Sequence, residues 1–277
     1  MTDFSELIKP FGDAFSGSLS LAYYHFASGS SFLHGATETM RSASLIKLPL
    51  LIQTLDRVAR GELSLANRYK MTAQDQVGGA GILHTLGEGL EPSLQDLLTL
   101  MIIVSDNTAT NMVIDLHGIA SVNAFMQSLS LSQTRLIGKL QLPPERQNEA
   151  QKSGLTNATC AADILGLLIR LEQGDLLPPE LTALAIGILK RQQFTEALAR
   201  YLPTDQELYE RSVTIASKSG CLRGLWHDAA IVYEGEHPLY ALVIMTDGSN
   251  DKSYSFEQEG MMLIAKLARK IYSYHSP

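Results

Sequence analysis

Strand-like segments lie at both ends of the chain, and a long helical block separates them; this order is what most constrains the fold. Near the N-terminus, residues 18–26 and 31–35 are apolar runs joined by a turn of alanine, glycine and serine, which predicts a hairpin. Near the C-terminus, three runs rich in β-branched and apolar residues predict an antiparallel meander, at 212–216, 229–233 and 239–245. One antiparallel sheet therefore has to join the two ends of the chain.

Helical periodicity accounts for the rest of the chain. Residues 4–15 and 262–271 each carry a stripe of apolar side chains at helical spacing, which predicts a terminal helix at each end. Between about 44 and 205 the chain is predicted to be mostly helical. Within this block, Ser93 with an acid three residues later is typical of a capping box. Residues 136–158 are irregular and polar, and loops of that length in compact domains are often functional.

The fold class that follows is α/β of the α+β type, with an antiparallel sheet flanked by terminal helices and an additional all-α subdomain. We expect a single domain over 1–277. Its α/β subdomain would comprise 1–41 and 206–277, and its all-α subdomain 42–205. A cleft between two such subdomains is the natural place for a site.

Composition restricts the function classes. The 277 residues are 45% hydrophobic and 18% charged, which is ordinary for a globular protein. The net charge of −7 argues against nucleic-acid partners, because these require a cationic surface. Two cysteines, Cys160 and Cys221, are too few for a disulfide scaffold and are read as reduced thiols. The histidines show no metal-ligand spacing, so we expect no metal and no cofactor.

The first residues are acidic, and no basic start followed by an apolar stretch marks a signal peptide. No run approaches the roughly 20 apolar residues that span a bilayer. We therefore expect no membrane partner. The expected location is the cytoplasm, with a mature exported chain carrying a new start codon as the alternative.

The first motif with chemical potential is Ser44-Leu45-Ile46-Lys47. In a helix, positions i and i+3 share a face, so the Ser44 hydroxyl and the Lys47 amine can touch. A serine hydroxyl becomes a good nucleophile only when a base takes its proton. A lysine serves as that base when burial or nearby positive charge lowers its pKa.

Two further motifs follow it. Ser105-Asp106-Asn107 lies at a predicted junction between helices, where its serine can relay a proton and its asparagine can hold a substrate amide. Lys218-Ser219-Gly220 lies at the end of a predicted strand. It supplies a cation for a substrate carboxylate, a hydroxyl, and a glycine that lets backbone approach a ligand closely.

Each motif alone has an ordinary structural explanation: an exposed polar pair, a helix cap, or a strand end with its turn. The combination is far more specific. The motifs follow one another at separations of 61 (105 − 44) and 113 (218 − 105), on a helix, a junction and a strand. Class A β-lactamases and penicillin-binding proteins carry this triple.

The sequence resembles this superfamily, the penicillin-recognising serine hydrolases, over essentially its full length, and is most similar to its class A-like members. Further matching stretches are Met101–Val104, Thr108–Asn111 and His227–Tyr233. The resemblance implies a β-lactamase/transpeptidase-like fold with the site between the two subdomains, and a small-molecule substrate, either a β-lactam or a peptide-like amide.

The resemblance also implies roles for individual residues. Ser44 would attack a carbonyl with help from Lys47, and Ser105 would pass a proton to the leaving nitrogen. Asn107 would orient the substrate. Lys218 and Ser219 would bind a carboxylate. The backbone N–H groups of Ser44 and Cys221 would form an oxyanion hole.

Two features depart from the family pattern. Class A β-lactamases carry a water-activating glutamate in the loop, and its expected position here falls near Leu140, in a stretch without an acid. Glu145 and Glu149 lie further along and are candidate displaced bases, or simply solvated loop charges. Without such a base, deacylation falls to Lys47, and β-lactam turnover is expected to be slow.

The second departure follows the third motif. Class A enzymes usually carry an arginine on the next strand, whereas here Arg223 lies in the turn and His227 opens the strand. His227 is either a pH-dependent cation for the carboxylate or a strand-edge residue capped by Asp228.

Three functions remain in competition. The leading hypothesis is a hydrolase that forms an acyl-enzyme and opens β-lactams. The first alternative is a peptidase, amidase or esterase with the same machinery and poor β-lactam turnover. The second is a catalytically silent ligand-binding or sensor protein.

Overall fold

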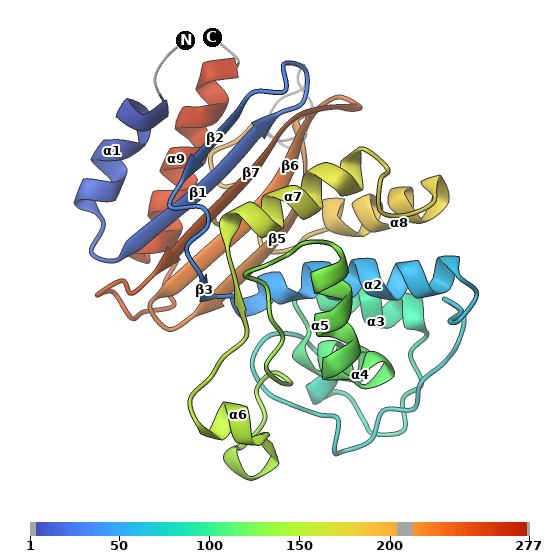
Figure 1. The fold of residues 1–277 in the computed structure, drawn as a ribbon. Coiled ribbons are helices and arrows are strands. Elements are labelled where there is room, and N and C mark those ends of the chain that lie inside the picture. Colours follow the sequence, from blue (N-terminus) through green and yellow to red (C-terminus); the bar gives the residue numbers. More distant parts are fainter. Residues whose placement is uncertain (1–3, 204–212, 276–277) are drawn as a thin grey trace.

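A five-stranded antiparallel sheet forms the centre of the computed structural model, which describes residues 4–203 and 213–275 (Figure 1). The strand order is β2-β1-β7-β6-β5, so the N-terminal hairpin pairs with the last strand of the C-terminal meander. The strands are β1 (Ser18–His25), β2 (Ser31–His34), β5 (Val213–Leu222), β6 (Leu225–Glu234) and β7 (His237–Asp247). This confirms the prediction of one antiparallel sheet that joins both ends of the chain.

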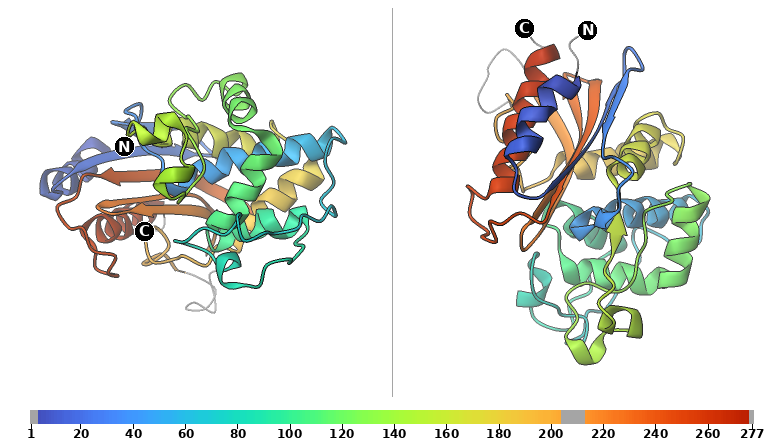
Figure 2. Two further views of the ribbon diagram at one scale, coloured as in Figure 1. Left: turned by 90° about the horizontal axis from the view of Figure 1, so that it is seen from below. Right: turned by 60° about the vertical axis from the view of Figure 1, so that its left-hand side comes forward.

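Alternating side chains along β7 divide the interior into two cores. The even-numbered residues from 240 to 244 pack with the terminal helices α1 (Phe4–Ala14) and α9 (Glu259–His275). The odd-numbered residues from 241 to 245 face the helical block. Figure 2 shows the terminal helices and the helical block on opposite faces of the sheet. A strand buried on both faces reads as the continuous apolar run seen in the sequence.

The helical block comprises α2 (Lys47–Ala59), α3 (Leu94–Ile103), α4 (Asn107–His117), α5 (Ile119–Ser128), α6 (Glu149–Lys152), α7 (Ala161–Glu172) and α8 (Pro179–Lys190). Helix α7 packs against β1 and β7, and α8 packs against β5. The predicted capping box is present at the start of α3, where the Ser93 hydroxyl accepts a hydrogen bond from the Asp96 N–H. No helix among the described residues is long and apolar enough to cross a bilayer.

Local details differ from the predicted boundaries. Ser44 lies in a short 3₁₀ helix, η1 (Ala43–Ile46), and the α-helix begins only at Lys47. Strands β5, β6 and β7 are longer than their apolar runs, because polar residues that are themselves mostly buried continue the hydrogen-bonded ladder. The predicted first residue of β5, Ser212, and the predicted boundary between 205 and 206 lie outside the described residues.

A second, two-stranded sheet leads into η1. Strand β3 (Met40–Arg41) pairs with β4 (Ala158–Thr159), which follows the long loop. Through this pairing, the segment before Ser44 is tied to the end of that loop.

The Asp106 carboxylate holds the junction between α3 and α4 together. Its Oδ1 accepts a hydrogen bond from the Ala109 N–H at 2.9 Å and so caps α4. Its Oδ2 accepts from the Ile82 and Leu83 N–H groups at 2.7 and 2.8 Å. A Cβ on Gly81 would lie 2.4 Å from the Asp106 Cγ, so only glycine fits there. The buried carboxylate thereby fixes the residues on either side of it, Ser105 and Asn107.

We expect Asp106→Asn to lower the free energy of unfolding by about 2–3 kcal/mol, because an amide cannot accept at all three N–H groups. The matched control is Asp96→Asn, which changes an exposed acid in the first turn of α3. It should cost roughly 0.3–1 kcal/mol. Urea denaturation of both variants measures the difference, and equal losses would contradict this role of Asp106.

Candidate active site

The three sequence motifs meet at the hydroxyl of Ser105. The Lys47 Nζ lies 3.0 Å from the Ser105 Oγ, and the Lys218 Nζ lies 3.1 Å from the same oxygen. Lys47 is the first residue of α2, Ser105 lies between α3 and α4, and Lys218 lies within β5. The two amines and the hydroxyl between them therefore come from three separate parts of the fold.

Lys47 makes two more hydrogen bonds. Its amine donates to the Ser105 carbonyl at 2.6 Å and to the Asn107 Oδ1 at 2.9 Å. No hydrogen bond between the Lys47 amine and the Ser44 hydroxyl occurs among the described residues. The 3₁₀ geometry at Ser44 and three nearby acceptors direct the amine towards Ser105 and Asn107 instead.

Burial sets the charge of both lysines. Each is fully buried, and burial lowers the pKa of Lys47 well below its ordinary value. The charge of Lys218 lowers it further. Burial also lowers the pKa of Lys218, to about 8. Burial disfavours the charged form of an amine, so Lys47 is the stronger candidate for the neutral base.

Gly220 brings the backbone of β5 against the nucleophile segment. A Cβ at Gly220 would lie 2.9 Å from the Ser44 N and 3.4 Å from the Leu45 N. This close approach requires a glycine. The approach places Gly220, and Cys221 directly after it, beside the Ser44 N–H. Backbone N–H groups at such a junction suit a developing oxyanion.

The residues on either side of Gly220 in β5, Ser219 and Cys221, differ in their exposure to solvent. Ser219 is nearly buried, and its carbonyl accepts a hydrogen bond from the Lys218 Nζ at 2.6 Å. Cys221 and Cys160 are both free thiols, of which Cys221 is exposed and Cys160 is buried.

Asn107 and Asn111, one turn apart on α4, hold the two loops that border the site. The Asn107 Nδ2 donates to the Gly78 carbonyl at 3.1 Å. The Asn111 side chain binds both backbone groups of Leu140, with distances of 2.8 and 2.9 Å. Leu140 therefore lies beside the site. It is the loop position at which the resemblance to class A β-lactamases would place the water-activating glutamate. Asn111 was not identified as a loop anchor, although its spacing of four residues from Asn107 is a usable signal.

The two candidate displaced bases lie on the surface. Glu145 is exposed, and the Glu149 side chain is 91% exposed and pairs with Lys152 at 2.9 Å. None of the hydrogen bonds of the described residues connects either carboxylate to Lys47 or Ser105. The structure thus gives the displaced-base hypothesis no support.

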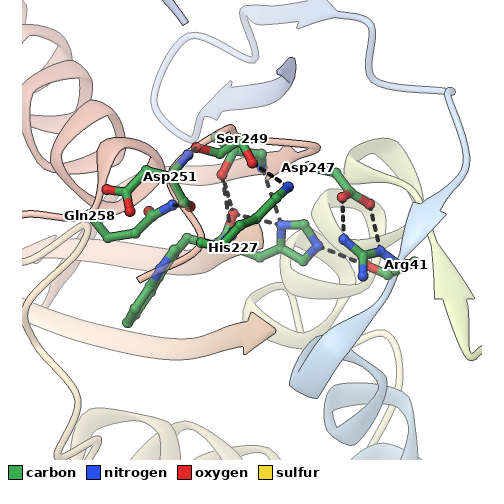
Figure 3. Close-up of polar contacts among 9 residues, drawn as sticks. Arg41, His227, Asp247, Ser249, Asp251 and Gln258 are labelled. Carbon is green, nitrogen blue, oxygen red and sulfur yellow. Dashed lines mark hydrogen bonds and ion pairs between the residues drawn. The ribbon is translucent and has the colours of Figure 1, made fainter. Parts of the chain in front are cut away.

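His227 fills neither of the roles predicted for it (Figure 3). It is fully buried, and its Nε2 lies 2.8 Å from the Arg41 carbonyl. Burial lowers its pKa to about 4, so it carries no charge with which to hold a carboxylate near neutral pH. Asp228 points to the other face of β6 and accepts from the Leu198 N–H at 3.0 Å, so it does not cap His227.

No group of three or more histidine, cysteine, aspartate or glutamate side chains that could hold a metal occurs in the described part of the chain.

Comparisons with known proteins show the family and agree with the fold. The model of the family described as "Beta-lactamase enzyme family" matches residues 3–275. A solved β-lactamase from Sphaerobacter thermophilus is 26% identical, with a TM-score of 0.85 over 99% of this chain and 98% of that one.

Two further relatives carry informative names. A leucine-to-glutamate variant of PBP-A, solved as an acyl-enzyme with penicillin G, is 25% identical, with a TM-score of 0.84 over 98% of this chain and 95% of that one. The "Beta-lactamase regulatory protein BlaB" of Streptomyces cacaoi is 22% identical over 83% of this chain and 84% of its own length.

We expect Lys218→Met to raise the pKa of Lys47, because it removes the positive charge that helps to keep Lys47 neutral. An NMR titration of the lysine side-chain signals measures this pKa in the wild type and the variant. Lys139→Met is the control, since it removes a surface cation that pairs with Asp115. An unchanged or lowered Lys47 pKa in Lys218→Met would contradict the proposed charge arrangement.

Proposed function

The chain belongs to the beta-lactamase enzyme family, and from that premise we propose that it is a serine hydrolase that forms an acyl-enzyme at Ser44 with β-lactams or related amides. The single observation that carries this proposal is the Ser105 hydroxyl between two buried amines, at 3.0 Å from Lys47 and 3.1 Å from Lys218. This arrangement suits a proton that moves from a nucleophile to a leaving nitrogen.

In the proposed acylation, the Ser44 Oγ attacks the substrate carbonyl and its proton passes to the neutral amine of Lys47. The carbonyl oxygen becomes an oxyanion and accepts hydrogen bonds from the N–H groups of Ser44 and Cys221. The C–N bond then breaks. The leaving nitrogen takes the proton of the Ser105 hydroxyl, and Lys47 returns a proton to Ser105, so one proton has moved from Ser44 to the leaving group.

Lys218 acts as the electrostatic partner in this scheme. As the cation, it donates to the Ser105 Oγ, which leaves the Ser105 hydrogen free to point at Lys47. Its charge and the Ser219 hydroxyl favour a substrate that carries a carboxylate next to the scissile bond.

Deacylation is the step for which this site is poorly equipped. Water needs a general base to attack an acyl-enzyme efficiently, and the loop residue that Asn111 holds beside the site is Leu140. We infer that β-lactams acylate Ser44 and are released slowly. This inference favours an amidase, peptidase or esterase whose natural substrate is not a β-lactam.

A silent binding or sensor protein is the second candidate, and the regulatory name of the Streptomyces relative favours it. The buried amines oppose it. Burying two lysines is costly, and a protein that only binds ligand has no use for that cost.

Ser44→Ala is expected to abolish covalent labelling by a fluorescent penicillin and to leave the fold intact, because the change removes only a half-buried hydroxyl. Gel fluorescence measures the labelling, and circular dichroism checks the fold. Persistent labelling of the variant would show that Ser44 is not the nucleophile.

Leu140→Glu is expected to speed deacylation of the penicilloyl-enzyme by about tenfold or more, because it places a base beside the site. The backbone bonds to Asn111 do not depend on the side chain, so the loop keeps its anchor. Single-turnover decay of the adduct and steady-state turnover of a chromogenic cephalosporin report the effect.

Glu145→Gln and Glu149→Gln are the controls for this substitution and should leave both acylation and deacylation unchanged. If either control slows deacylation, a displaced base exists. If Leu140→Glu acylates normally but decays at the wild-type rate, Leu140 is not the reason for slow release.

A further inference from the structure

Arg41 is held by the sheet through both its main chain and its side chain (Figure 3). Its carbonyl lies 2.8 Å from the Nε2 of His227 on β6. Its guanidinium forms a two-point ion pair with Asp247 at the end of β7, with distances of 3.0 Å from Nε and 2.5 Å from Nη2. Two strands of the large sheet thus fix a single residue of the short strand β3.

Three backbone groups lie within hydrogen-bond distance of the two nitrogens of the His227 ring. The Thr246 N–H donates to the Nδ1 at 3.2 Å, so Nδ1 needs a free lone pair. The Nε2 faces the Arg41 carbonyl, which can only accept. A proton on Nε2 suits the Arg41 carbonyl and the Thr246 N–H, whereas a proton on Nδ1 would suit the Trp226 carbonyl and leave the Arg41 carbonyl without a donor from the ring. The Trp226 carbonyl, 2.7 Å from Nδ1, receives its own hydrogen bond from the Thr246 hydroxyl at 2.8 Å.

Burial lowers the pKa of His227, the carbonyl groups of Arg41 and Trp226 raise it, and the two charged neighbours act in opposite directions. Asp247 favours the protonated imidazole, and Arg41 disfavours it. Burial is the larger effect, and it keeps the ring neutral. The Nε2–H therefore remains available to the Arg41 carbonyl near neutral pH.

Arg41 precedes the proposed nucleophile by three residues, and the residues between them are also held. The Ser42 N–H donates to the Asn157 carbonyl at 2.8 Å. Ala43 has a φ of 43°, in the left-handed region that a residue with a Cβ rarely adopts. Such a conformation persists only when its surroundings impose it. Ser44 then meets the backbone of β5 at Gly220.

We propose that His227 is a positioning residue, whose Nε2–H holds the Arg41 carbonyl and thereby sets the place of Ser44 against the end of β5. This role rests on the proposed acylation at Ser44. His227 touches neither the substrate nor the reacting atoms, and it acts only through the segment from Arg41 to Ser44.

Two amide variants separate positioning from mere packing. In His227→Gln, the side-chain nitrogen reaches about as far as the Nε2 and can still donate to Arg41. In His227→Asn, the amide nitrogen corresponds to the Nδ1 and falls short of the carbonyl. Both variants place an uncharged amide in the same buried space, so they serve as matched controls for each other.

The rates of acylation by benzylpenicillin and of labelling by a fluorophosphonate are measured for each variant over a range of concentrations up to saturation, and melting curves confirm folding. For His227→Asn, we expect the acylation rate constant to fall by about tenfold to a hundredfold, with the half-saturating concentration unchanged. His227→Gln should stay within about threefold of the wild type. Equal rate constants for the two variants would overturn the proposal.

NMR of the wild-type histidine side chains gives an answer even if the variants fail to fold. It should show a neutral His227 ring with a protected proton on Nε2 at neutral pH. A ring protonated on Nδ1, or on both nitrogens, would overturn the proposal. Fluorophosphonate labelling also separates the positioning role of His227 from the proposed acylation of Ser44 by β-lactams. If benzylpenicillin never labels the wild type but fluorophosphonate labelling follows the Asn and Gln difference, only the acylation of β-lactams fails.

Discussion

The site depends on one hydroxyl shared by two buried amines. The Ser105 Oγ lies within 3.1 Å of the Nζ atoms of both Lys47 and Lys218, and both side chains are inaccessible to solvent. Two ammonium groups bound to the same buried hydroxyl repel each other in a medium that screens charge poorly. The arrangement is stable only if one of them gives up its proton, and the pKa of Lys47 is lowered the more strongly. A neutral amine, a hydroxyl and an ammonium in a row constitute a relay for one proton.

The rest of the fold brings these three groups together and keeps them there. The sheet closes the two ends of the chain on each other, so that β5 arrives at the N-terminal end of α2. The buried Asp106 carboxylate fixes the junction that carries Ser105. On the opposite side, Arg41 connects β6 and β7 to the residues just before Ser44. A nucleophile held from several directions needs little rearrangement to reach an attack geometry.

Much of the fold and part of the candidate site were predictable from the sequence, because they depend on local patterns. The single antiparallel sheet and the capping box at Ser93 follow from periodicity and caps, and the loop position of Leu140 follows from the resemblance to class A β-lactamases. What failed depends on distant partners. In a strand, neighbouring side chains point to opposite faces, and only the register tells which face meets what. His227 was therefore assigned to the substrate side, although it faces Arg41. Nor does spacing within one helix reveal that Lys47 bonds to Ser105 and Asn107 rather than Ser44.

A time course of intact mass with benzylpenicillin, followed by peptide mapping of the adduct, tests the central claim most directly. The account predicts one penicilloyl group per chain, attached to Ser44, that forms readily and persists long after free benzylpenicillin is removed. The absence of an adduct, or an adduct on a residue other than Ser44, would contradict it.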